Sequence, residues 1–157
     1  PGVPTDSNIY FTSTSGGDSK GGQIWRYERK DRDLGFLTLV FESPNKDVLY
    51  MPDNICMRPK SDLLFVCEDG DYPGTESKNF LRILAPNGKM ADFARNVSAE
   101  FPRSEFAGST FSPDGKTLAT QVERLELSGP VGSLYELRIS TDWAHTDEPL
   151  RVILTPL

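Results

Sequence analysis

Five oxygen-bearing side chains in three short segments have the chemistry to bind a metal ion. The segment "YMPDNICM" contains Asp53 and Asn54, "LLFVCEDGD" contains Glu68 and Asp69, and "SEFAG" contains Glu105. Hard cations such as Ca²⁺ take six to eight oxygen ligands from carboxylates, amides and carbonyls. We therefore predict that these residues converge on a metal site.

Simpler roles remain open for the same residues. The run 69–71, Asp-Gly-Asp, has the composition of an ordinary turn. Glu105 could cap a turn or pair with Arg103. Cys67, which precedes the acidic pair, is typical of a small buried hydrophobe, although a thiolate there would favour a transition metal.

Other kinds of active site find little support in the sequence. The single histidine, His145, lies in the polar loop "TDWAHTDEP", which argues against a Ser-His-Asp triad and against a histidine-based zinc site. The loop "TSGGDSKGGQ" is glycine-rich but matches neither a Walker loop nor the GxGxxG pattern. Metal-assisted chemistry through carboxylates is the route that remains for an enzyme.

The elements that would position these residues follow an internal repeat. Three apolar triplets recur, and their middle residues, 54 positions apart, are Tyr10, Leu64 and Leu118. A second strand-like run follows each triplet, and the arginines in these runs, 56 positions apart, are Arg26, Arg82 and Arg138. We predict that the arginines face solvent or bridge neighbouring units.

Each repeat reads as about four short β-strands joined by turns rich in Gly, Pro, Asn and Asp. Units of this length with four strands are typical of β-propeller blades. The fold class predicted is therefore all-β, with one propeller-type region over residues 1–157 and units at about 3–45, 50–97 and 105–157. Propellers have at least four blades. We expect the chain to form part of a longer propeller, the alternative being that its blades pack against another protein.

Composition restricts the partners. The chain has 157 residues, 37% of them hydrophobic, and a net charge of −6 without any basic run. This charge argues against nucleic acid and anionic membranes. No apolar run approaches the roughly 20 residues of a membrane helix, and the start "PGVPTDSNIY" lacks the pattern of an export signal.

The geometry expected for Cys56 and Cys67, diagonal neighbours on one face of a hairpin, disfavours a disulfide.

Several segments together resemble a known family. They are "TSGGDSKGGQIWRYE", "LTLVFESPNKDVLYMPDNICMRP", "FVCEDGD", "LRILAPNGKMADFARN" and "SEFAGSTFSPDGKTL". This set is similar to the C-terminal half of the PhoX-type alkaline phosphatases and their uncharacterised bacterial relatives, over about residues 8–120. The resemblance implies a six-bladed propeller, exported by the twin-arginine route, that hydrolyses phosphoesters with calcium and iron at the mouth of its channel. Three units would be half of that ring.

The resemblance also implies roles for individual residues. Glu105 of "SEFAG" is expected to be a metal-binding carboxylate, with Asp53 and Asn54 of "PDN" and Glu68 and Asp69 of "CEDG" near the same site. The small residues at 107–108 would let the backbone approach the crowded channel centre. Such metals would hold the phosphate, neutralise developing negative charge and activate the attacking group.

The sequence departs from the family pattern after Thr120, where it continues "QVERLELSGPVGSLYELRIS". The N-terminal half that would complete the metal cluster is also absent from the 157 residues. We therefore expect phosphatase activity of a full-length parent and none of this chain alone. The partners expected are the remaining half of the propeller or another protein subunit, and a phosphoester substrate. The localisation expected is exported or periplasmic, with an organelle lumen as the alternative.

A non-catalytic role is the second hypothesis. In that case the chain is a propeller-derived scaffold or extrinsic subunit that binds a larger protein assembly, and its divergent tail serves the binding. A further motif, Asn96-Val97-Ser98, fits a glycosylation sequon, which matters only in a secretory protein.

Overall fold

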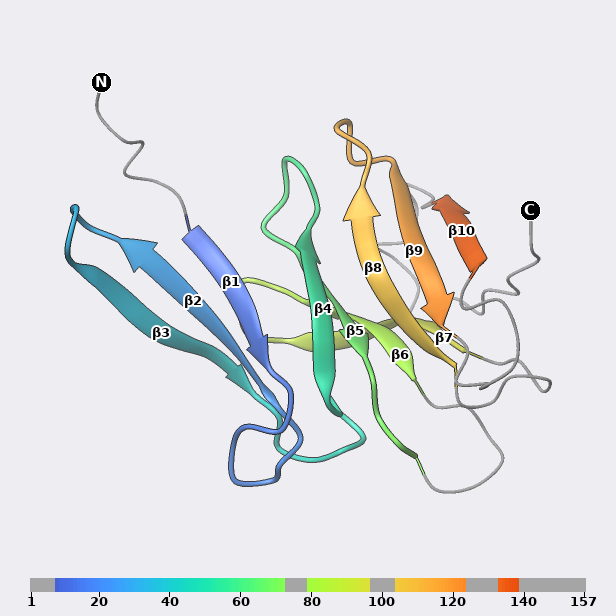
Figure 1. The fold of residues 1–157 in the computed structure, drawn as a ribbon, viewed down its shortest axis with the longest axis horizontal. Coiled ribbons are helices and arrows are strands. Elements are labelled where there is room, and N and C mark those ends of the chain that lie inside the picture. The colour runs from blue at the N-terminus through green and yellow to red at the C-terminus, as the bar shows by residue number, and fades with distance from the viewer. Residues whose placement is uncertain (1–7, 73–78, 97–103, 124–132, 139–157) are drawn as a thin grey trace. The chain divides into compact units, whose positions relative to one another are not determined.

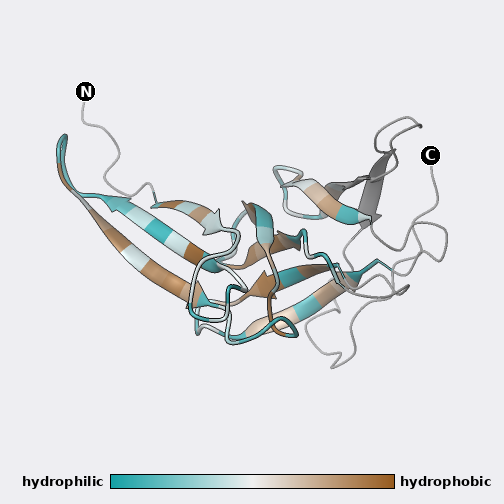
Figure 2. Ribbon diagram, turned by 60° about the horizontal axis from the view of Figure 1, so that its bottom comes forward, coloured by the Kyte–Doolittle hydropathy of each residue, from teal (hydrophilic) through white to brown (hydrophobic). Residues whose placement is uncertain are grey.

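The computed structural model of the chain describes residues 8–72, 79–96, 104–123 and 133–138 (Figure 1). In this part the protein is all-β, as predicted, and its strands form three antiparallel sheets. The strands are β1 (Asn8–Ser13), β2 (Gln23–Arg29), β3 (Gly35–Glu42), β4 (Pro52–Met57), β5 (Leu64–Glu68), β6 (Phe80–Leu84), β7 (Met90–Arg95), β8 (Glu105–Phe111), β9 (Thr117–Glu123) and β10 (Ser133–Arg138). Hydrophobic and hydrophilic bands both occur along the strands (Figure 2).

Each sheet is a meander in which consecutive strands are neighbours. The orders are β1-β2-β3, β4-β5-β6-β7 and β8-β9-β10, and each sheet lies inside one of the three predicted units. The middle residues of the repeated triplets fall on β1, β5 and β9, and the repeated arginines fall on β2, β6 and β10. The arrangement of these sheets as propeller blades stays a prediction, and the last predicted strand, residues 150–157, lies outside the described residues.

The chain divides into two compact units, 1–52 and 53–157. In the first unit, the glycine-rich loop 14–22 connects β1 to β2, and its Gly22 is hydrogen-bonded to Gly16 within the loop and to Ser43 after β3. Ser43, which follows β3, is buried, and its hydroxyl donates to the carbonyl oxygen of Leu49 at 2.6 Å. Gly22 has φ +109°, and a Cβ there would lie 2.2 Å from Cδ of Pro52. Only glycine fits this position, because both the conformation and the space exclude a side chain.

The second unit contains the other two sheets, which share one hydrophobic core. Its buried members come from β5, β6 and β7 on one side and from β8 and β9 on the other: Phe65, Cys67, Leu81, Ile83, Phe93, Ala94, Phe106 and Leu118. Phe65 is the centre of an aromatic group, with ring centroids 5.1 Å from Phe93 and 4.8 Å from Phe111 in edge-to-face geometry. Such contacts, and the apolar area that the three rings bury, fix β8 against the middle sheet.

Strand β8 contains a β-bulge. Between Ala107 and Thr110 the register shifts, so that Gly108 and Ser109 together stand opposite Thr120 of β9. Gly108 has φ +58°, a left-handed conformation that glycine adopts without steric cost. A Cβ at Gly108 would meet no described atom within 4 Å, so the structure requires glycine there for its conformation. The predicted close approach of residues 107–108 to a channel centre stays a prediction.

The bulge changes which side chains of β8 face the core. Successive side chains of a strand alternate between its faces, and one extra residue reverses the alternation beyond it. Phe106 lies before the bulge and Phe111 beyond it, yet both pack on the shared core. Ser109 also faces this core, where it contacts Cys67 of β5. The bulge therefore separates Ser109 from Glu105, although regular alternation would place them on one face.

Candidate metal site

The five predicted ligands all lie in the second unit. Asp53 and Asn54 are on β4, Glu68 ends β5, Asp69 follows it, and Glu105 begins β8. Their exposure differs: Asp53 is exposed, Asn54 and Asp69 are half-buried, and Glu68 and Glu105 are buried. Buried carboxylates are the unusual members of this set, because a buried charge is costly unless protein groups or metals compensate it.

Protein groups compensate Glu68. Its side chain is fully buried, and its Oε1 accepts a hydrogen bond from Nε of Arg82 at 2.9 Å. Its Oε2 accepts from the backbone N–H of Phe80 and from the hydroxyl of Tyr72, both at 3.1 Å. Burial, followed by the charge of Glu68, raises the pKa of Tyr72, so this hydroxyl remains a donor. Glu68 thus has donors at both carboxylate oxygens.

The partner of Glu68 corrects a prediction about the repeated arginines. Arg82 does not face solvent, because its side chain is 3% exposed and pairs with Glu68 of β5 and with Asp92 of β7, both in its own sheet. The guanidinium also lies 3.8 Å from the ring centroid of Phe80. Burial alone would lower the pKa of Arg82, but the two carboxylates outweigh it and the pKa is raised. Arg82 therefore stays charged in the interior.

Two buried asparagines connect the segments that carry Asp69 and Glu105. Asn79 immediately precedes β6 and Asn96 immediately follows β7. The backbone N–H of Gly70 donates to Oδ1 of Asn79 at 2.8 Å. The carbonyl oxygen of Ser104 accepts from Nδ2 of Asn96 at 2.9 Å and from Nδ2 of Asn79 at 3.4 Å. Because its amide is buried and bonded in this way, the sequon at Asn96 offers no accessible acceptor for a glycan.

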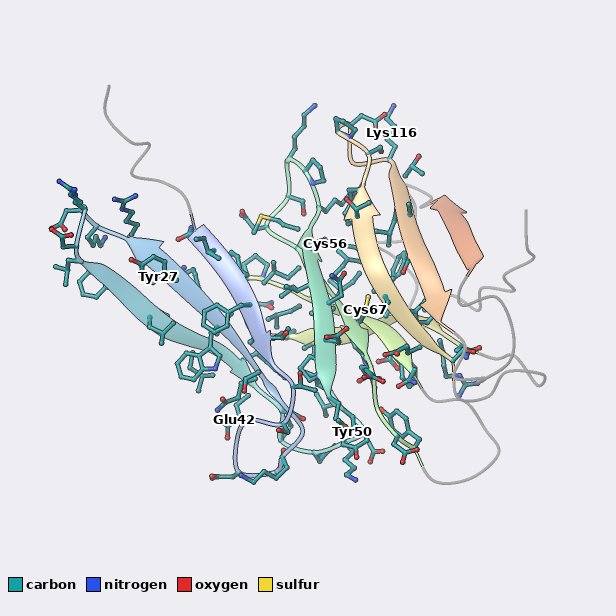
Figure 3. The ribbon with its side chains drawn as sticks, in the orientation of Figure 1. Tyr27, Glu42, Tyr50, Cys56, Cys67 and Lys116 are labelled. Atoms are coloured by element: carbon teal, nitrogen blue, oxygen red, sulfur yellow. The ribbon has the colours of Figure 1, made fainter. Side chains whose placement is uncertain are left out.

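The thiol of Cys67 lies where β5 faces β8 (Figure 3). Its sulfur is 3.0 Å from Oγ of Ser109, which donates to Oγ1 of Thr120 at 2.8 Å, and Thr120 in turn donates to the carbonyl oxygen of Ala107 at 3.2 Å. Since the hydroxyl hydrogen of Ser109 is directed to Thr120, Cys67 must be the donor to Ser109. The chain of hydrogen bonds is complete only when Cys67 is protonated.

Cys56 and Cys67, for which the sequence disfavours a disulfide, are both free thiols. Burial raises the pKa of Cys67 to about 11; Ser109 lowers it, and the charges of Asp53 and Glu105 add to the increase. Burial, with a smaller contribution from Cys67, raises the pKa of Cys56 to about 12. Thiolate chemistry is therefore disfavoured at both positions.

The remaining donors suit a hard cation in type. Oδ1 of Asn54 is buried and has no hydrogen-bond partner among the described residues. Carboxylate and amide oxygens fit Ca²⁺, whereas the protonated Cys67 does not fit a transition metal. Within the described ranges, however, no three Asp, Glu, Cys or His side chains are arranged to hold a metal ion. The convergence of all five predicted ligands stays a prediction.

Sequence reasoning missed the residues that support these carboxylates. The repeat identifies Arg82 but does not predict its buried pairing, and no sequence motif points to Asn79. A signal was available, because an asparagine flanks each end of the β6–β7 hairpin in the sequence. Asn96 was considered only as part of a sequon.

Comparison with known proteins gives one result. The family model described as "Alkaline phosphatase PhoX" matches residues 2–124, most of the chain and all of β1 to β9. The chain belongs to the PhoX alkaline phosphatase family. This family comprises metal-dependent phosphatases, and the relationship suggested by the sequence motifs is confirmed. No curated protein and no solved structure shows a significant match.

Among the described residues, no helix has the length and apolar character required to cross a membrane.

Proposed function

We propose that this PhoX-family chain supplies ligands to the metal centre of a phosphoester hydrolase. The observation that carries the proposal is the burial of Glu105, which is 8% exposed at the start of β8 and adjoins Ser104, whose carbonyl oxygen is hydrogen-bonded to the same Asn79 that binds the residue after Asp69. Family membership supplies the reaction type. The proposed ligands are Glu105, Asp53, Asn54 and Asp69, with the buried Oδ1 of Asn54 directed to the cation.

Glu68 has a different part in this proposal. Its two oxygens accept three hydrogen bonds, from Arg82, Phe80 and Tyr72, which occupy most of the acceptor positions of a carboxylate and compete with a metal ion. We therefore assign Glu68 to the support of the site, where it fixes the end of β5 and the start of Asp69. Its role as a direct ligand remains an untested prediction.

The metals proposed are calcium and iron, the calcium on the basis of oxygen ligands and the iron on the basis of the family. When bound, they would neutralise charge on the phosphate and activate the attacking group. The chain itself orients Glu105 through the peptide bond that follows Ser104, and it excludes water from that carboxylate by burial. The raised pKa keeps the thiol of Cys67 neutral, so it adds no negative charge to this unit.

The propeller arrangement and the partners belong to the same proposal. The described residues form three sheets, fewer than the four or more of a closed propeller. Further sheets, from the remainder of the propeller or from another subunit, would supply the other ligands. Export of the mature protein is proposed on the basis of the family.

The test is the variant Glu105→Gln in the natively purified protein, together with any chain that accompanies it. We expect near-stoichiometric calcium and iron in the wild type by elemental analysis, and turnover of a phosphomonoester. In the variant we expect a decrease in metal affinity and turnover of about 100-fold or more. The control is Asp62→Asn, which removes a carboxylate at an exposed position between β4 and β5 and should retain both. Normal metal content and turnover of Glu105→Gln would remove Glu105 from the site.

The end of the family match at residue 124 favours a second candidate function, a non-catalytic subunit of a larger assembly. In that case the natively purified wild type contains neither calcium nor iron, shows no turnover, and copurifies with a partner in defined stoichiometry. The same elemental analysis therefore distinguishes the two functions.

A further inference from the structure

The two buried asparagines, Asn79 and Asn96, act on peptide groups that adjoin the acidic residues. The N–H of Gly70, which donates to Asn79, belongs to the peptide group that also contains Cα of Asp69. The carbonyl of Ser104, which accepts from both asparagines, belongs to the peptide group that contains Cα of Glu105. Since a peptide group is planar, fixing one of its polar atoms restricts the orientation of the attached Cα.

The asparagines are also connected to each other. The backbone N–H of Asn96 donates to the carbonyl oxygen of Asn79 at 3.0 Å, which extends the β6–β7 pairing by one step. Asn79 and Asn96 are 3% and 7% exposed. The two therefore form one rigid, buried unit that contacts Gly70 on one side and Ser104 on the other.

Burial makes these bonds specific. A buried amide without partners is costly, so Asn79 and Asn96 are held to the geometry in which Gly70 and Ser104 satisfy them. Hydrophobic contacts between the sheets would tolerate small shifts, because apolar attraction is not directional. The hydrogen bonds add the directional constraint that a ligand set requires.

We propose that Asn79 and Asn96 are positioning residues that set the separation and orientation of Asp69 and Glu105 for a divalent cation. This inference rests on the proposed function, because it takes Glu105 as a metal ligand. It assigns to two asparagines, neither of them a ligand, a share of the affinity for Ca²⁺.

The first test is Asn96→Asp, measured by calcium titration of the natively purified protein. The substitution preserves size but replaces the amide donor to Ser104 with a carboxylate oxygen. An added negative charge near a cation would by itself strengthen binding. We expect the opposite, a decrease in calcium affinity of about 10-fold to 100-fold, because the orientation of Glu105 is lost. We also expect faster hydrogen exchange in the peptide that contains 104–111.

Two control variants separate positioning from charge and from stability. Asn87→Asp makes the same chemical change in the exposed turn between β6 and β7 and should leave calcium affinity unchanged. Leu84→Ala removes a fully buried side chain of β6 and should lower stability while affinity for calcium is retained. If Asn96→Asp does not fold, Asn79→Asp gives the same test, because it preserves the acceptor for Gly70 and removes the donor to Ser104.

The outcomes distinguish this inference from the proposed function. If the wild type binds no calcium, or binds it equally well after Glu105→Gln, the proposed function fails and the inference fails with it. If Glu105→Gln abolishes binding but the folded aspartate variant binds calcium as tightly as the wild type or more tightly, only the positioning role is overturned. A selective decrease in the aspartate variant, absent from both controls, supports it.

Discussion

Replacement of Arg82 by methionine should destabilise the second unit strongly. The substitution preserves most of the side-chain length but removes the charge that compensates Glu68, whose side chain is 0% exposed. Removing one partner of a buried ion pair costs about 3–5 kcal/mol of the free energy of unfolding, because the other charge is left without compensation. Asp92 also loses its partner, but its side chain is 35% exposed, so water replaces much of that interaction.

The companion variants make the estimate specific. Glu68→Gln should cost less, about 1–3 kcal/mol, because Arg82 keeps Asp92 and the new amide oxygen still accepts from Phe80. The double variant Glu68→Met with Arg82→Met should recover most of the loss, since apolar residues of similar volume often replace a buried pair without net cost. The order of stability expected is therefore wild type and double variant, then Glu68→Gln, then Arg82→Met.

Urea unfolding followed by far-UV circular dichroism measures these differences. With a dependence on urea of about 2 kcal/mol per molar, a loss of about 4 kcal/mol lowers the midpoint by about 2 M. A cost below about 1 kcal/mol for Arg82→Met would show that Glu68 is not held as a desolvated charge. A double variant as unstable as Arg82→Met would refute the reasoning that the unpaired charge is the cause.

The other predictions concern thiols and a glycine. At pH 8 the folded protein should react with iodoacetamide about 100-fold more slowly at Cys67 than an ordinary thiol, because a pKa of about 11 instead of 9.0 lowers the thiolate fraction by that factor; equal rates in folded and urea-unfolded protein would contradict this. The folded state raises the pKa of both thiols, so the protonated thiols contribute to the free energy of unfolding. This contribution is complete below pH 9 and is lost as the pH rises through about 11 to 12. Urea titrations of wild type and Cys67→Ser at several pH values would detect the loss. Gly22→Ala should lower the stability of the first unit by about 2 kcal/mol or more, as measured by hydrogen exchange of β1 to β3, whereas Gly88→Ala, also at positive φ but without a close neighbour, should cost less.

The sequence predicted the fold class and the strands well because period and turn composition are local properties. The triplets and the arginine runs identified β1, β2, β5, β6, β9 and β10 without any knowledge of their partners. It failed where an environment depends on the register between strands. Arg26 and Arg82 occupy corresponding positions, yet Arg26 is partly exposed and lies 4.0 Å from Glu28 in its own strand, whereas Arg82 is buried against Glu68. The position that aligns with Glu68 is Thr14 in the first unit, so the repeat could not reveal the pair.

The candidate site was predictable in part for the same reason. Residue type indicated that Glu105, Asp53 and Asp69 could bind a cation, but type alone does not show whether a carboxylate is already satisfied, as Glu68 is. The support by Asn79 and Asn96 depends on contacts between segments 25 and 8 residues from Ser104, which no short motif encodes. Family membership confirmed the general class of reaction and left these contacts to the structure.

The bulge at Gly108 divides strand β8 into two parts, and the side chains of each part alternate between the faces in their own pattern. Side chains before the bulge follow one alternating pattern and side chains after it follow the opposite pattern. Glu105 and Ser109 therefore lie on different faces of the strand although an even number of residues separates them. Loss of a single residue there would exchange the faces of everything on one side of the deletion. The number of residues in this strand therefore matters as much as their identity. A substitution changes the contacts of one side chain, whereas an insertion or deletion changes the face of every side chain beyond it.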